Sequence, residues 1–124
     1  LVWHAFDDMK GGEIYVKKIP SMKVTDVALA VDKNTKQEEV GIRPGEKLHE
    51  QMIGIEDALY TYEYPGHFKI LPSINNWAKD EARIGDGVRV PEDFMYTSDN
   101  NKEWMEISEL KNWIESNKNK IGNI

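Results

Sequence analysis

Residues 60–70, YTYEYPGHFKI, have the pattern of a β-hairpin. Aromatic or aliphatic side chains recur at every second position on both sides of Pro65-Gly66, which is the spacing of one face of a strand. Pro65-Gly66 is a residue pair typical of a tight turn. Tyr60, Tyr62 and Tyr64 can line a sugar-binding surface, but such an alternation more often forms the packed face of a hairpin. We therefore predict two antiparallel strands joined at residues 65–66.

Residues before the hairpin predict alternating helices and strands. Val2, Ala5, Phe6 and Met9 share one helical face, and the glycine pair that follows is a typical helix end. Further expected elements are a strand over residues 13–17, a helix over 21–31 with Ser21 as its N-cap, a strand over 37–42 and a short helix over 47–53. This order is typical of an α/β (α+β) fold with few short strands and flanking helices.

The part of the chain after the hairpin is expected to be irregular from residue 72 to about residue 97, because it is rich in glycine and proline. Ser108 is the expected N-cap of a last helix that carries Leu110, Trp113 and Ile114. We expect the four tryptophans to act as core or interface anchors. They are Trp3, Trp77, Trp104 and Trp113.

Length and charge exclude several classes of protein. A chain of 124 residues predicts one domain, and its 16 basic and 22 acidic residues give a net charge of −6 with no basic run. Nucleic-acid binding is therefore disfavoured. The absence of cysteine excludes disulfides and thiolate metal sites. No apolar run is long enough to cross a membrane, and no signal peptide is visible. We expect a cytoplasmic protein, and the start at Leu1 inside a predicted helix suggests a piece of a longer one.

Catalytic motifs are absent from the sequence. Gly85-x-Gly87 lacks the third glycine of a dinucleotide-binding loop, and His49-Glu50 lacks the second histidine of a zinc-protease motif. No tyrosine is followed four residues later by lysine, the spacing that short-chain dehydrogenases use. His4 and His67 lie far apart in the sequence, and Asp7-Asp8 has the pattern of a solvated charge pair. We therefore expect no catalytic residue and no metal site in this chain.

The Arg43-Pro44-Gly45-Glu46 loop is the motif with the most chemical content. A guanidinium offers a planar fork of donors suited to a phosphate, and a glycine lets the backbone approach a ligand. The carboxylate three residues later can accept hydrogen bonds from the paired hydroxyls of a ribose. The loop can therefore hold a nucleoside diphosphate, with Arg43, Gly45 and Glu46 as the candidate substrate-binding residues. It can equally be an ordinary turn whose Glu46 lies in solvent.

Six segments of this sequence, each three to ten residues long, closely resemble one protein family. They are residues 11–16 (GGEIYV), 18–23 (KIPSMK), 41–50 (GIRPGEKLHE), 62–64 (YEY), 70–73 (ILPS) and 96–101 (YTSDNN). The family comprises the inverting UDP-N-acetylglucosamine 4,6-dehydratases, which are extended short-chain dehydrogenases/reductases of capsule, O-antigen and pseudaminic acid biosynthesis. The segments resemble the C-terminal part of these enzymes. Lys17, where the family often has proline, and residues 75–90 depart from its pattern.

The resemblance implies that this chain is the small C-terminal substrate-binding domain, with a nucleotide-sugar-binding part over residues 1–74 and a C-terminal extension over 75–124. In the family, an N-terminal Rossmann domain binds NADP and carries the catalytic residues. Arg43 is then expected to contact the UDP phosphates and Glu46 the ribose. The chain alone is expected to be inactive, with no cofactor of its own, with a UDP-sugar as its ligand and with self-association into a homo-oligomer. The alternatives are a non-catalytic oligomerisation or interaction module derived from that family and a free-standing binding protein for UDP-sugars.

Overall fold

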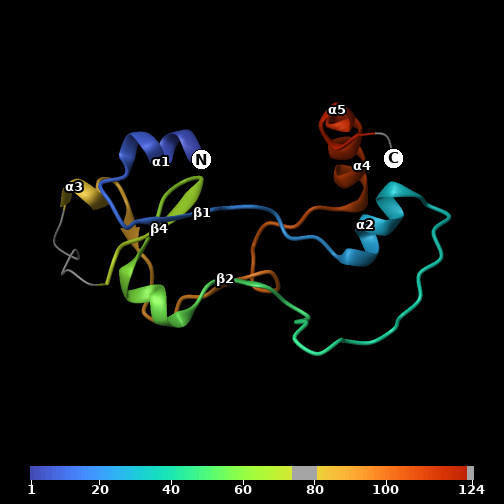
Figure 1. Ribbon diagram of the computed structural model, residues 1–124, viewed down its shortest axis with the longest axis horizontal. Helices are drawn as coiled ribbons and strands as arrows, with labels where there is room; N and C mark the ends of the chain where they lie inside the picture. The colour runs from blue at the N-terminus through green and yellow to red at the C-terminus, as the bar shows by residue number, and fades with distance from the viewer. Residues whose placement is uncertain (74–80, 123–124) are drawn as a thin grey trace. The chain divides into compact units, whose positions relative to one another are not determined.

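The computed structural model describes residues 1–73 and 81–122, which form two compact units (Figure 1). Leu1–Ile19 and Glu50–Ser98 make up the first, which we call the sheet unit. Pro20–His49 and Asp99–Ile124 make up the second, which we call the helical unit. Each unit is therefore built from two separate segments of the chain. The proposed division at residue 74 stays a prediction.

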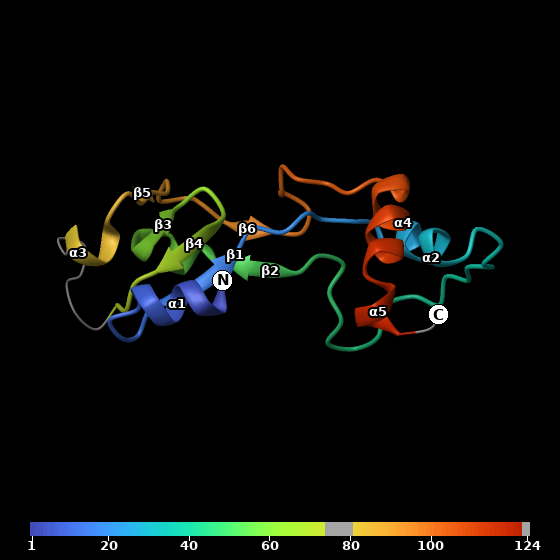
Figure 2. The same cartoon turned by 90° about the horizontal axis from the view of Figure 1, so that it is seen from above.

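The sheet unit is built on an antiparallel four-stranded sheet of order β1-β4-β3-β5 (Figure 2). The strands are β1 (Ile14–Lys17), β3 (Thr61–Glu63), β4 (His67–Ile70) and β5 (Val88–Arg89). The predicted hairpin is confirmed as β3 and β4, and the N–H of Tyr64 donates to the carbonyl of His67 at 2.9 Å across the turn. Tyr60 lies just before the hairpin, at the end of the 3-10 helix η1 (Ile55–Tyr60).

The hydrophobic core lies between this sheet and a second, two-stranded sheet of β2 (Gln51–Ile53) and β6 (Tyr96–Thr97). The ring of Phe68 packs at 5.1 Å from the ring of Tyr96 and at 5.3 Å from that of Phe94, between ring centres. The buried core residues are Val16, Ile53, Ala58, Phe68, Ile70, Val90 and Tyr96. Their burial is the main favourable term for folding of this unit.

Helix α1 (Val2–Asp8) and helix α3 (Glu81–Ile84) complete the sheet unit. The predicted N-terminal helix is confirmed, but its apolar face does not enter the core. Val2, Trp3 and Phe6 are 68%, 81% and 74% exposed, and α1 has no buried residue. Among the other tryptophans, Trp104 and Trp113 are also about half exposed, so none of these three is a core residue within this chain. Trp77 lies outside the described residues.

The helical unit contains α2 (Val24–Val31), α4 (Ile107–Ser116) and α5 (Lys118–Ile121). Both predicted helices form, but neither predicted serine cap does. Lys23 is the N-cap of α2, while Ser21 forms a parallel β-bridge with Trp104. Helix α4 begins one residue before Ser108, and a capping box between Glu106 and Glu109 satisfies its first N–H groups.

Two other predicted elements are wrong. Residues 37–42 form no strand and are exposed throughout, so the predicted order of helix, strand, helix and strand ends at α2. Residues 47–53 form no helix, because 51–53 pair with β6 as strand β2. The mixed α+β character with few short strands is nevertheless confirmed. In the described ranges, no helix is both long and apolar enough to cross a membrane.

Candidate functional site

The predicted phosphate-binding residues lie together in one exposed turn of the helical unit. The N–H of Glu46 donates to the carbonyl of Arg43 at 3.1 Å, and the N–H of Arg43 donates to Oε2 of Glu46 at 3.0 Å. Nε of the Arg43 guanidinium lies 3.8 Å from Oε1 of Glu46. Gly45 has φ +85°, a left-handed conformation that favours glycine. The spacing of the motif therefore brings its guanidinium and its carboxylate side by side.

Both side chains of this turn are available to a ligand. The side chains of Arg43 and Glu46 are 78% and 52% exposed. An ion pair with this exposure contributes between 0 and about 1 kcal/mol, because water screens it. Little free energy is therefore lost when a ligand displaces one partner of the Arg43–Glu46 ion pair. A Cβ on Gly45 would meet no heavy atom within 4 Å, so the glycine serves the backbone conformation in this structure.

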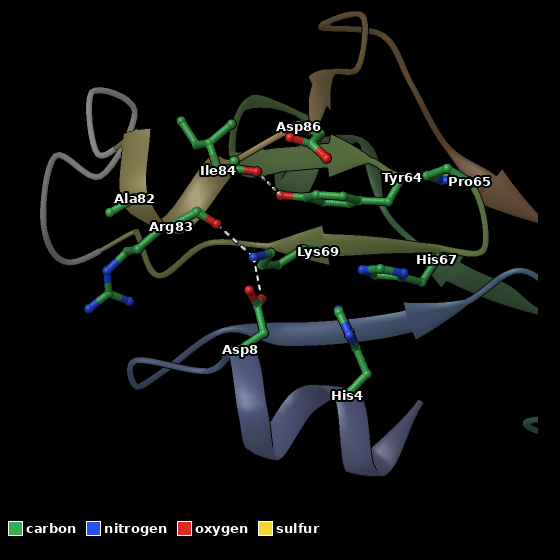
Figure 3. A pocket seen from close by; sticks show the side chains of 11 residues that line it. His4, Asp8, Tyr64, Pro65, His67, Lys69, Ala82, Arg83, Ile84 and Asp86 are labelled. Carbon is green, nitrogen blue, oxygen red and sulfur yellow. Dashed lines mark hydrogen bonds and ion pairs between the residues drawn. The ribbon is translucent and has the colours of Figure 1, made fainter.

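A second group of candidate site residues surrounds the buried Lys69 of β4 (Figure 3). Its ammonium donates to Oδ2 of Asp8 at 2.5 Å and to the carbonyl of Arg83 at 2.6 Å. The Tyr15 hydroxyl donates to the same carboxylate oxygen at 2.6 Å. The hydrogen bonds from Lys69 and Tyr15 lower the pKa of Asp8, while burial raises the pKa of Tyr15. The prediction of a solvated Asp8 is therefore wrong.

A buried ion pair lies next to this cluster. Nη1 of Arg83 is 2.5 Å from Oε1 of Glu13, and their side chains are 9% and 1% exposed. Burial raises the pKa of Glu13, but hydrogen bonds from its own backbone N–H and those of Gly11 and Lys10, together with the Arg83 charge, outweigh it. The net pKa is lowered, so Glu13 is ionised at neutral pH. The pair links the residue just before β1 to α3.

A cavity of about 340 Å³ opens beside the cluster, with His4, Asp8, Tyr64, His67 and Lys69 among its lining residues. The rings of Tyr64 and His67 are stacked 4.7 Å apart, and the His4 ring lies 5.0 Å from that of His67. Nε2 of His67 is buried without a hydrogen-bond partner in the described part of the chain. Burial lowers the pKa of His67, and the nearby His4 and Lys69 add to this effect.

Sequence reasoning did not bring these histidines together. His4 and Asp8 are one helical turn apart, which is the local signal that both face β4. His49 belongs to the helical unit. In the described ranges, no three His, Cys, Asp or Glu side chains gather in a way that could hold a metal ion. The cavity is therefore a polar and aromatic site, in which most charges are already paired.

The comparisons with known proteins place the sequence in a family. A family model described as "polysaccharide biosynthesis protein" matches residues 1–72, more than half of the chain. This chain belongs to that family. It is 46% identical over 110 residues to the UDP-N-acetylglucosamine 4,6-dehydratase (inverting) of Campylobacter jejuni serotype O:2, a match that covers 85% of this chain. The enzyme of the same description from serotype O:23/36 is 43% identical over the same length. The resemblance to inverting dehydratases is confirmed.

The matches also delimit what this family assignment covers. This chain spans 33% of the length of both Campylobacter enzymes. Its fold is similar to that of Pen from Bacillus thuringiensis, with a TM-score of 0.74 and 26% sequence identity. That likeness covers 94% of this chain and 35% of Pen. The family and the mixed helix-and-strand fold are thus established for a chain that spans about a third of the length of each of these relatives.

Proposed function

We propose that this chain binds the nucleotide part of a UDP-sugar, as the substrate-binding region of a nucleotide-sugar 4,6-dehydratase or epimerase in surface polysaccharide biosynthesis. The observation that carries the proposal is the turn of residues 43–46, which presents an exposed guanidinium beside an exposed carboxylate. The similarity to two UDP-N-acetylglucosamine dehydratases supports UDP as the nucleotide. The proposed residues are Arg43, Gly45 and Glu46, and the proposed location is the cytoplasm.

The chemistry of the turn suits this role. The Arg43 guanidinium can donate two parallel hydrogen bonds to one phosphate. The Glu46 carboxylate can accept hydrogen bonds from two neighbouring ribose hydroxyls. Binding a substrate through groups remote from its reacting atoms still assists catalysis, because it fixes the orientation of the sugar. The hydride chemistry and NADP belong, in this proposal, to residues outside this chain, so the chain alone is inactive.

Calorimetry with UDP tests the phosphate contact. The Arg43→Ala variant is expected to bind UDP at least about 10-fold more weakly than the parent chain, because it loses charge-assisted hydrogen bonds worth about 1.5–3 kcal/mol. Lys47→Ala is the matched control, because it also removes one positive charge from an exposed residue, directly after Glu46. Its UDP affinity should stay within about threefold of the parent chain.

Three results would contradict this proposal. The first is a parent chain that takes up no UDP, and the second is an equal loss of affinity in the Arg43→Ala and Lys47→Ala variants. The third is product formation from UDP-N-acetylglucosamine and NADP by this chain alone, which would show that its own residues perform the chemistry.

A second candidate function is an oligomerisation module, which the exposed apolar residues of α1 favour. Val2, Trp3 and Phe6 leave an apolar surface in water that a second copy of the chain can cover. Light scattering is expected to show a homo-oligomer of the parent chain. Trp3→Lys should shift it toward the monomer, while Trp113→Lys on the half-exposed helix α4 should not. A parent chain that is monomeric at high concentration would exclude this function.

A further inference from the structure

Helix α1 is held on the sheet by polar and aromatic contacts rather than by apolar burial. None of its residues is buried, and its most apolar side chains are exposed. Asp8 binds Lys69 and Tyr15, while the His4 ring packs edge-on against Tyr15 at 6.1 Å and lies 5.0 Å from His67. Figure 3 shows His4 and Asp8 directed from α1 toward β4. Its attachment therefore depends on the charge state of these groups.

The surroundings of His67 favour its neutral imidazole. Its ring lies on Tyr64 and faces His4, and its buried Nε2 meets no acceptor in the described residues. An imidazolium carries an N–H on both ring nitrogens, so Nε2 would then be a donor without an acceptor, which is costly in a buried site. Protonation would also add a positive charge close to the Lys69 ammonium.

We propose that His4 and His67 form an acid-sensitive latch, which holds α1 on the sheet at neutral pH and loosens it as the pH falls. Since His4 and Asp8 of α1 both line the cavity, loosening α1 opens the cavity wall. Titratable and charged groups around the latch come from every neighbouring element. They are Asp8 on α1, Tyr15 on β1, Lys18 after β1, Tyr64 after β3, Lys69 on β4, Arg83 on α3 and Asp86 after α3.

The direction of the pH dependence follows from the number of protons bound when α1 is docked on the sheet and when it is released. The pKa of His67 is lowered when α1 is docked, whereas a released histidine has its ordinary pKa of about 6.5. The released state therefore binds more protons at acidic pH. The contribution of His67 to docking is full above about pH 6.5 and is lost as the pH falls through the lowered pKa of His67. Asp8 stays ionised over this range because its pKa is also lowered, so the Asp8 pair with Lys69 is not the titrating element.

Hydrogen exchange of the full chain measures the latch directly. The backbone N–H groups of Ala5 and Met9 bond to carbonyls at the start and middle of α1. Their protection, corrected for the intrinsic pH dependence of exchange, should fall several-fold between pH 7.5 and pH 5.5. Protection of β1 and β4 amides, which lie in the sheet, should change much less over the same range. An equal loss of exchange protection in α1 and in the sheet would indicate general unfolding and would overturn the proposal.

Variants of the histidines separate the latch from other acid effects. His67→Phe keeps an aromatic ring on Tyr64 but cannot be protonated, so α1 should keep its protection at pH 5.5. His67→Gln provides the same test if phenylalanine fails to fold. His49→Phe is the matched control, because His49 lies in the helical unit, and its pH response should equal that of the parent chain. A parent-like response in both His67 variants would overturn the proposal, as would a His67 resonance that titrates above pH 6.5.

Discussion

Replacing Glu13 with glutamine should lower the free energy of unfolding of the sheet unit by about 3 kcal/mol. The side chains of Glu13 and Arg83 are both almost completely buried, and their charged atoms are 2.5 Å apart. A glutamine has nearly the same shape, but it removes the carboxylate charge that lies against the buried Arg83 guanidinium. Removing one partner of a buried ion pair is strongly destabilising, because both groups were taken out of water to form it. Urea unfolding followed by circular dichroism measures the change.

An exposed pair provides the control for this substitution. Glu115 and Lys118 are 2.7 Å apart in the helical unit, but their side chains are 70% and 56% exposed. Glu115→Gln should therefore change the free energy of unfolding by no more than about 0.5 kcal/mol. If Glu13→Gln costs as little as Glu115→Gln, the ion pair between Glu13 and Arg83 is not formed in solution.

The hairpin could be predicted from the sequence because its information is local. The alternation on both sides of Pro65-Gly66 sets the strands, and the turn sets their register. Residues 37–42 have a similar alternation of Val40 and Ile42, yet they form no strand. A strand also needs a partner with free hydrogen-bonding groups, and a local pattern does not contain that information. Helices α1, α2 and α4 were predictable for the same local reason, whereas the two serine caps and the helix predicted over residues 47–53 were wrong.

The two candidate sites differ in how far apart their residues lie in the sequence. Arg43 and Glu46 are three residues apart, so their spacing alone places them in one turn. Lys69 alternates with the core residues Phe68 and Ile70, and the alternation predicts that it faces water. It is buried instead, because Asp8, 61 residues earlier, brings α1 over that face of the sheet. No local pattern reports a contact of this range.

Replacing Phe68 with alanine should lower the free energy of unfolding by about 3–5 kcal/mol. Phe68 is only 4% exposed and packs against the rings of Phe94 and Tyr96, so its removal leaves a cavity where the two sheets meet. A loss of this size is a large part of the stability of a small protein, and we expect the sheet unit to unfold at moderate urea concentrations. Thermal and urea unfolding of the variant measure the effect.

Phe6→Ala is the matched control, and it also tests whether a second copy of the chain covers Phe6. Phe6 is 74% exposed on α1, so Phe6→Ala should change the free energy of unfolding by no more than about 0.5 kcal/mol in the monomer. A cost that grows with protein concentration would show instead that a second copy covers Phe6, because dissociation then becomes part of unfolding. A cost comparable to that of Phe68→Ala at every concentration would contradict the outward orientation of the apolar face of α1.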